Sequence, residues 1–118
     1  MSTAEPFPVI VGWRHSRRAG VVTATRPGPS PARLEWRAGT PPAYDALVVE
    51  DEDSFDLSGR PVDYRRFGHR AGDIEMVSEE WTWRVDGDLV TLTGTVPRED
   101  YLSVCELFED VAATVVSG

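Results

Sequence analysis

The sequence contains a single cysteine, Cys105, so no disulfide can form within the chain. An oxidising compartment is therefore not implied. No apolar run approaches the about 20 residues that a membrane-spanning helix needs, and the N-terminus lacks the basic-then-apolar pattern of a signal peptide. We therefore expect a cytoplasmic protein.

Patterns that hold metals or phosphates are also missing. The two histidines, His15 and His69, stand alone in their segments, without His or Cys at ligand spacing. No glycine-rich phosphate fingerprint is present. The acidic run at residues 45–56 lacks the calcium-loop pattern, because Phe55 and Asp56 stand where a ligand and a glycine are needed. We expect no metal and no cofactor.

Lysine is absent, so every basic side chain is arginine, and the formal net charge is −8. The charge is unevenly placed: residues 1–43 carry +4 and residues 44–118 carry −12. This balance disfavours a nucleic-acid binder, whose affinity depends on neutralising phosphates. It is compatible with a basic protein partner, and equally with a charged surface that only keeps the protein in solution.

Length and composition indicate one globular domain. The 118 residues, 41% of them apolar, suffice for a single core without disulfides or metals. We therefore assign residues 1–118 to one domain. Residues 1–8 are polar and contain proline, and we expect them to form a flexible arm.

Residues 79–93 have the pattern of a β-hairpin. Asp86-Gly87 suits a two-residue type I′ turn, because Gly adopts positive φ freely and Asp tolerates it. A one-residue slip would set tryptophans against threonines and waste their burial. The register that keeps apolar residues together pairs Trp83 with Val90, Trp81 with Leu92 and Thr82 with Thr91.

After Gly94 the apolar period changes from two to 3.6, which predicts an amphipathic helix. Pro97 suits its first turn, because proline has no N–H to leave unpaired there. The apolar stripe comprises Tyr101, Val104, Cys105, Phe108, Val111, Ala112 and Val115. We expect this stripe, with Cys105 as a buried apolar residue, to pack on the face that carries Trp81 and Trp83.

The rest of the chain reads as short strands between turns. Alternation predicts strands at residues 9–13, 21–25, 33–37, 44–49 and 62–67, and loops at 14–20, 26–31, 50–56 and 68–72. The apolar run 46–49 suggests an interior strand that is covered on both sides. The sequence therefore predicts an α+β fold: a curled antiparallel sheet of about six to seven strands with one C-terminal amphipathic helix packed on it.

The acidic run offers the first candidate site. We expect it to be a solvated loop. Of the two binding roles that it could have, a partner site is preferred over a metal site, because opposite charge on a partner would relieve mutual repulsion and speed encounter. Its residues are Glu50, Asp51, Glu52, Asp53 and Asp56. The first functional hypothesis follows: a non-enzymatic protein-interaction domain (a small inhibitor, immunity-type, adaptor or chaperone protein) that binds a basic partner.

A basic cluster carries the second hypothesis. Arg65, Arg66, His69 and Arg70 could hold an anion, or could form internal ion pairs with Asp63, Asp73 or the acidic run. An anion site would belong to a small-ligand-binding domain with an aromatic pocket. A third hypothesis is an enzyme with a dispersed site drawn from His15, His69 and the carboxylates. A cavity lined by Trp and Arg would favour the second hypothesis, and a flat acidic face the first.

Overall fold

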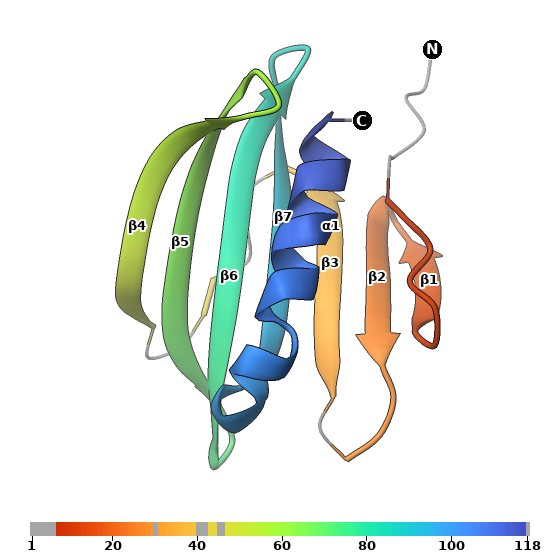
Figure 1. Ribbon diagram of the computed structural model, residues 1–118, viewed down its shortest axis with the longest axis vertical. Helices are drawn as coiled ribbons and strands as arrows, with labels where there is room; N and C mark the ends of the chain where they lie inside the picture. Colours follow the sequence, from red (N-terminus) through yellow and green to blue (C-terminus); the bar gives the residue numbers. More distant parts are fainter. Residues whose placement is uncertain (1–6, 30, 40–42, 45–46, 118) are drawn as a thin grey trace.

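In the part of the chain that the structure describes, seven antiparallel strands form one open sheet, and a C-terminal helix packs on one face of it (Figure 1). The computed structural model describes residues 7–29, 31–39, 43–44 and 47–117. The strands are β1 (Arg14–Arg18), β2 (Val21–Arg26), β3 (Ala32–Ala38), β4 (Val48–Leu57), β5 (Arg60–Ala71), β6 (Ile74–Val85) and β7 (Asp88–Pro97), in the order β1-β2-β3-β7-β6-β5-β4. The predicted α+β fold is confirmed.

The β6–β7 hairpin has the predicted register. Trp83 pairs with Val90 and Trp81 with Leu92. The turn residues Asp86 and Gly87 have φ of 52° and 85°, as a type I′ turn requires. Both strands extend beyond the predicted range, so that β6 begins at Ile74 and β7 ends at Pro97.

The helical region begins later than predicted. Pro97 ends β7, a 3-10 helix follows at Arg98–Ser103 (η1), and α1 spans Cys105–Ser117. Val104 separates the two helices, because its φ of −130° is not helical. Cys105, at the start of α1, is half-buried rather than buried, so that expectation was wrong.

The apolar stripe of α1 packs where the sequence predicts. Phe108 and Val115 are buried with Trp81 and Trp83 in one hydrophobic cluster. Phe108 lies directly on Gly94 of β7: a Cβ there would stand 2.6 Å from Phe108 Cδ2 and 2.7 Å from Cε2. The absence of a side chain at Gly94 therefore lets the helix approach the sheet.

The N-terminal prediction was wrong. Residues 9–13 form no strand, whereas β1 occupies the predicted loop and pairs with β2. All of β1 is exposed, so its sequence lacks the alternation of apolar and polar residues that indicates a strand. Phe7 and Trp13 are half-buried against the core. Residues 1–6 of the predicted arm lie outside the described residues.

Two predictions for the region before β5 were also wrong. The acidic run is not a loop but lies in β4, the edge strand next to β5. The apolar run 46–49 is not an interior strand: Val48 and Val49 open β4 with 64% and 41% of their surface exposed, and Ala46 lies outside the described residues. Charged residues are common on edge strands, because they discourage unwanted strand pairing.

The sheet face opposite α1 carries a polar layer partly covered by Tyr44. Its ring lies 4.9 Å from the ring of Phe67 and 4.8 Å from that of His69. Burial raises the pKa of Tyr44. No helix in the described part of the chain is long and apolar enough to cross a membrane.

Candidate functional site

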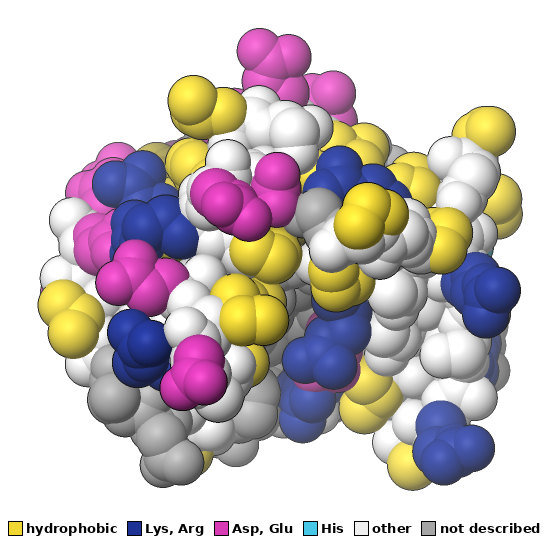
Figure 2. Space-filling view, turned by 90° about the horizontal axis from the view of Figure 1, so that it is seen from below, with side chains coloured by type: hydrophobic (Ala, Val, Ile, Leu, Met, Phe, Trp, Pro, Cys, Tyr) yellow, Lys and Arg dark blue, Asp and Glu magenta, His cyan; other side chains and the backbone are white. Residues whose placement is uncertain are grey.

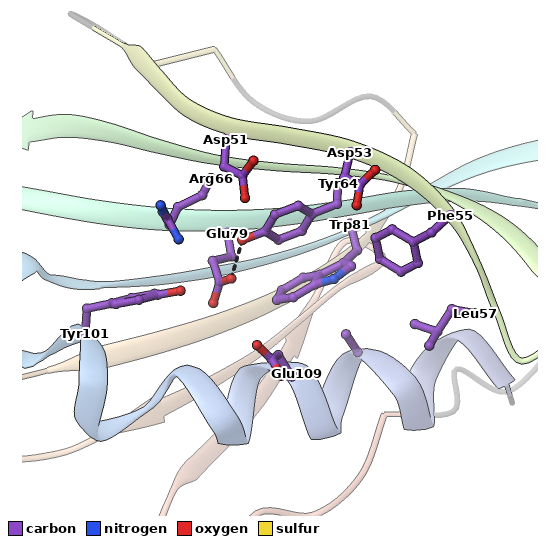
Figure 3. Close-up of a pocket in the computed structure, with 11 residues that line it drawn as sticks. Asp51, Asp53, Phe55, Leu57, Tyr64, Arg66, Glu79, Trp81, Tyr101 and Glu109 are labelled. Carbon is purple, nitrogen blue, oxygen red and sulfur yellow. Dashed lines mark hydrogen bonds between the residues drawn. The ribbon is translucent and has the colours of Figure 1, made fainter.

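A cleft of about 390 Å³ lies between α1 and the strands β4, β5 and β6 (Figure 3). It forms on the side where α1 contacts β4 as well as β6. Aromatic rings line it: Tyr64 on β5 pairs with Trp81 on β6, with their ring centroids 5.4 Å apart, and Phe55 lies 6.5 Å from Tyr64. Tyr101 of η1 closes one end.

Glu79 is the most deeply buried ionisable group of the cleft. It lies two residues before Trp81 on β6, so its side chain shares the face that carries the core. Only 2% of its surface is exposed. Its Oε2 accepts a hydrogen bond from the Tyr64 hydroxyl at 2.5 Å, while Oε1 has no hydrogen-bond partner among the described residues.

This environment shifts the acid–base equilibria of the cleft. Burial, more than any other cause, raises the pKa of Glu79. Burial and the nearby Glu79 raise the pKa values of Tyr64 and Tyr101. The Tyr101 side chain points toward Glu79 and lowers its pKa, but does not reach hydrogen-bond geometry with Oε1 (Figure 3).

The acidic run is divided between the two sides of β4. Asp51 and Asp53 line the cleft and are exposed, whereas Glu52 and Asp56 lie at the alternate positions. None of these four makes an ion pair with a described residue. Asp51 and Asp53 thus bring two carboxylates of the predicted partner site to the rim of the cleft.

Glu50 has a different role, because it is already paired. It follows Val49 at an irregularity in the β4–β5 register, and its carboxylate binds Arg98 and lies 3.5 Å from Arg66. The hydrogen bond from Arg98 lowers the pKa of Glu50. Gly68 makes room for this pairing, because a Cβ there would stand 2.8 Å from Arg98 Nη2.

The structure does not gather the predicted basic cluster into one site. Arg65 lies on the face away from α1 and holds Glu80 at 2.7 Å. Arg66 faces the cleft, 5.7 Å above the Tyr101 ring. Arg70 is exposed near Glu75, at 3.9 Å, and donates to the Asp73 carbonyl at 3.0 Å. Seen from below, acidic and basic side chains are mixed on the β4–β6 side, at the left of Figure 2, whereas basic side chains dominate the β1–β3 side.

The histidines bind neutral partners. His69 Nε2 lies 2.8 Å from Ser78 Oγ, which lies 2.8 Å from Thr95 Oγ1. Ser78 is completely buried, so a substrate could not reach its hydroxyl in this arrangement. Burial lowers the pKa of His69. His15 Nε2 accepts a hydrogen bond from the Ile10 N–H at 3.0 Å. Within the described ranges, no three His, Cys, Asp or Glu side chains are placed to hold a metal ion.

Sequence reasoning did not select Glu79, Tyr64, Trp81 or Tyr101 as a site. A usable signal was present: counting back by two from Trp83 and Trp81 places Glu79 on the apolar face of its strand. A carboxylate at such a position is costly to bury and therefore indicates a function or a partner.

The first prediction concerns the burial of Glu79. Replacing Glu79 with glutamine should raise the free energy of unfolding by roughly 1 kcal/mol near neutral pH, because it removes a buried charge that no described residue pairs with. Since the folded state raises this pKa above its ordinary 4.5, the wild type binds the proton more tightly when folded and loses stability as pH rises through the raised value. The stability that Glu79→Gln gains over wild type should therefore appear above about pH 4.5 and become constant above the raised pKa of Glu79.

Thermal melts of both proteins at several pH values measure this difference. Glu80→Gln is the matched control on the opposite face: Glu80 is also buried, but its Oε1 holds Arg65. The free energy of unfolding of that variant should be roughly 1–2 kcal/mol lower than that of wild type, since Arg65 would lose its charged partner while remaining partly solvated. A Glu79→Gln protein less stable than wild type at neutral pH would contradict the prediction.

Comparison with known proteins defines the fold class. The chain is similar to a protein of unknown function from Pseudomonas aeruginosa, PA94, described as a putative regulator, with TM-score 0.68, 9% identity, and coverage of 86% of this chain and 94% of that one. It is also similar to LpqN, involved in cell envelope biogenesis of Mycobacterium tuberculosis, with TM-score 0.55, 14% identity, and coverage of 92% and 78%. At these identities the likeness is one of fold alone. No family model and no curated protein matches the sequence.

Proposed function

We propose that the protein is a non-enzymatic interaction domain that binds an extended basic segment of a partner protein along β4. The observation that supports this most strongly is the edge strand itself, which carries Asp51, Glu52, Asp53 and Asp56 without ion-pair partners among the described residues. An inhibitor, immunity-type, adaptor or chaperone role fits such a surface. The proposal includes a cytoplasmic location, as expected from the sequence.

The backbone of β4 explains why the partner would be extended. One side of an edge strand presents N–H and C=O groups that no neighbouring strand pairs, and an added strand can satisfy them. Carboxylates along β4 repel acidic strands and attract basic ones, so the same residues protect the edge and select the partner. Asp51 and Asp53 would then meet the side chains that the partner strand directs toward α1.

A second candidate function is small-ligand binding in the cleft. Its volume of about 390 Å³ lies within the range of small-molecule pockets, roughly 300–1,000 Å³. The lining holds four carboxylates (Asp51, Asp53, Glu79 and Glu109) and one guanidinium, that of Arg66. This balance favours a cationic ligand over the anion that the basic cluster suggested.

The second prediction tests the role of the acids. Once affinity capture and mass spectrometry have identified a partner, Asp51→Asn with Asp53→Asn should slow association roughly tenfold at low salt and flatten its salt dependence, because steering by charge acts mainly on the association rate. Glu50 is left unchanged, since it holds Arg98.

The matched control is Glu106→Gln with Asp110→Asn, which removes the same charge from exposed positions of α1. Stopped-flow association at low and moderate salt compares the three proteins. Equal rates for wild type and the β4 variant at both salt concentrations would remove these two acids from the mechanism.

A further inference from the structure

Glu79 presents an unpaired carboxylate oxygen to the cleft. Its Oε1 has no hydrogen-bond partner among the described residues, although only 2% of the residue is exposed. A buried acceptor without a donor costs free energy and is uncommon in folded proteins. Glu80 also keeps one unpaired oxygen, but its charge is matched by Arg65 at 2.7 Å. Glu79 has no such counterion in the described part of the chain, so a donor that is also a cation would satisfy it best.

The surroundings of Glu79 favour a cation. The faces of Tyr64 and Trp81, whose rings lie 5.4 Å apart, carry negative π density that attracts cations. Asp51, Asp53 and Glu109 are exposed at the cleft and add negative potential along the approach (Figure 3). The positive charge of Arg66 is offset by Glu50 at 3.5 Å.

The hydrogen bonds already present select among cations. A guanidinium binds a carboxylate best through both oxygens at once. Oε2 of Glu79 already accepts a hydrogen bond from the Tyr64 hydroxyl, at 2.5 Å, so a guanidinium that bound both oxygens would have to share Oε2 with that hydroxyl. A primary ammonium is a compact charge that needs only one oxygen, and its alkyl stem can pack along aromatic walls.

We propose that this cleft binds the primary ammonium group of a lysine side chain, with the Glu79 carboxylate accepting its hydrogen bond and the rings of Tyr64 and Trp81 beside its alkyl stem. The inference rests on the proposed function, in which a basic segment along β4 supplies the lysine. Asp51 and Asp53 on β4 point into the same cleft as Glu79 (Figure 3), so a side chain entering from that strand passes them first.

The proposed contact predicts how affinity varies with pH. Because burial raises the pKa of free Glu79, this carboxyl keeps its proton to a higher pH than an ordinary glutamate does, and the protonated form lacks the charge that binds the ammonium. Affinity should therefore increase as pH rises through that value, while the ammonium stays charged. The groups that face Glu79 are Tyr64 and Arg66 from β5, Tyr101 from η1, Glu109 from α1 and Asp51 from β4.

The probe for the contact is n-butylammonium chloride, which carries the lysine head group on a stem of the same length; sodium butyrate is the matched anion. Chemical shifts of the Trp81 indole N–H, followed by NMR at constant ionic strength, report occupancy. Saturable shifts are expected with butylammonium and not with butyrate. Glu79→Gln should weaken binding roughly 10- to 100-fold, as expected for loss of a hydrogen bond to a charged group. Glu80→Gln should bind as wild type does.

Two results would overturn the ammonium site: saturable shifts with butyrate instead, which would assign the cleft to an anion on Arg66, or unchanged butylammonium binding in Glu79→Gln. The pH series on the wild type needs no variant, and an affinity that fails to rise with pH would also count against it.

Binding of two capped peptides, one of alternating lysine and threonine and one of alternating arginine and threonine, tests this inference separately from the proposed function. We expect the lysine peptide to bind more tightly, with dependence on Glu79 and on Asp51 with Asp53. Peptide binding that needs the two aspartates but not Glu79 would overturn the cleft inference and leave the proposed function standing. If butylammonium binds through Glu79 but neither peptide binds, the ammonium group does not come from a lysine of a bound segment. That result would overturn both this inference and the proposed function.

Discussion

Replacing Phe108 with alanine is expected to lower the free energy of unfolding by about 3–5 kcal/mol, which is a large share of the about 5–15 kcal/mol that stabilises a typical domain. Phe108 is completely buried at the centre of the contact between α1 and the sheet. Its ring lies on Gly94, and the cavity left by truncation would be bounded by the rigid sheet. Chemical denaturation of wild type and variant measures the loss.

Gly94 supplies a cross-check on this packing. Gly94→Ala alone should cost roughly 1–3 kcal/mol, because the new Cβ would stand 2.6–2.9 Å from three atoms of the Phe108 ring. In the Phe108→Ala background the same substitution should cost almost nothing, so the two changes should be strongly non-additive. Leu102→Ala is the control in the adjoining η1, since 85% of Leu102 is exposed and its removal should change stability little. Additive losses at Gly94 and Phe108 would contradict this packing.

Ending the chain at Val96 is expected to leave an unfolded or aggregating product. The truncation removes η1 and α1 and exposes the apolar face that carries Trp81, Trp83 and Leu92, each of which is at most 3% exposed in the full chain. A sheet with one such face uncovered presents a large apolar patch to water. Solubility, circular dichroism and the presence or absence of a cooperative thermal transition provide the test.

Supplying residues 97–118 as a separate peptide distinguishes loss of packing from loss of chain length. If α1 is part of the core, the peptide should recover soluble, folded protein when the two pieces are co-expressed. A soluble and cooperatively folding truncation on its own would show that the helix is dispensable, and that its apolar stripe serves a partner instead.

The hairpin and the helix stripe were predictable because several local signals agree. In β6 and β7 the Asp86-Gly87 turn and the alternation of apolar residues specify the same register. In α1 the buried residues Phe108, Val111, Ala112 and Val115 keep the period of 3.6. The helix start was missed because Pro97 suits the first turn of a helix and equally the end of a strand.

The two edge strands could not be found from alternation. β1 is exposed along its whole length and β4 along most of it, so neither has to alternate apolar with polar residues. What holds β1 in place is pairing with β2 across the turn at Ala19 and Gly20, both with positive φ. Ala at such a position is uncommon, so the turn gave a weak signal.

Some residues of the cleft could be predicted from the sequence. Asp51 and Asp53 belong to the predicted partner site, and Tyr101 belongs to the predicted stripe. Their meeting with Glu79 depends on β4 lying beside β5 at the edge of the sheet and close to α1, and that arrangement is set by tertiary packing. The separation of Arg65 from Arg66 follows from the alternation of side chains along β5.

Binding of a basic segment along β4 is tested most directly by amide hydrogen exchange of the protein with and without its captured partner. Exchange reports which backbone N–H groups gain hydrogen bonds, and an edge strand that receives a neighbour should gain protection along its free side. We predict slower exchange in β4 (Val48–Leu57) and unchanged exchange in β1 (Arg14–Arg18), the strand at the other edge of the sheet. Unchanged exchange in β4 on binding, with protection appearing elsewhere, would contradict the proposed function.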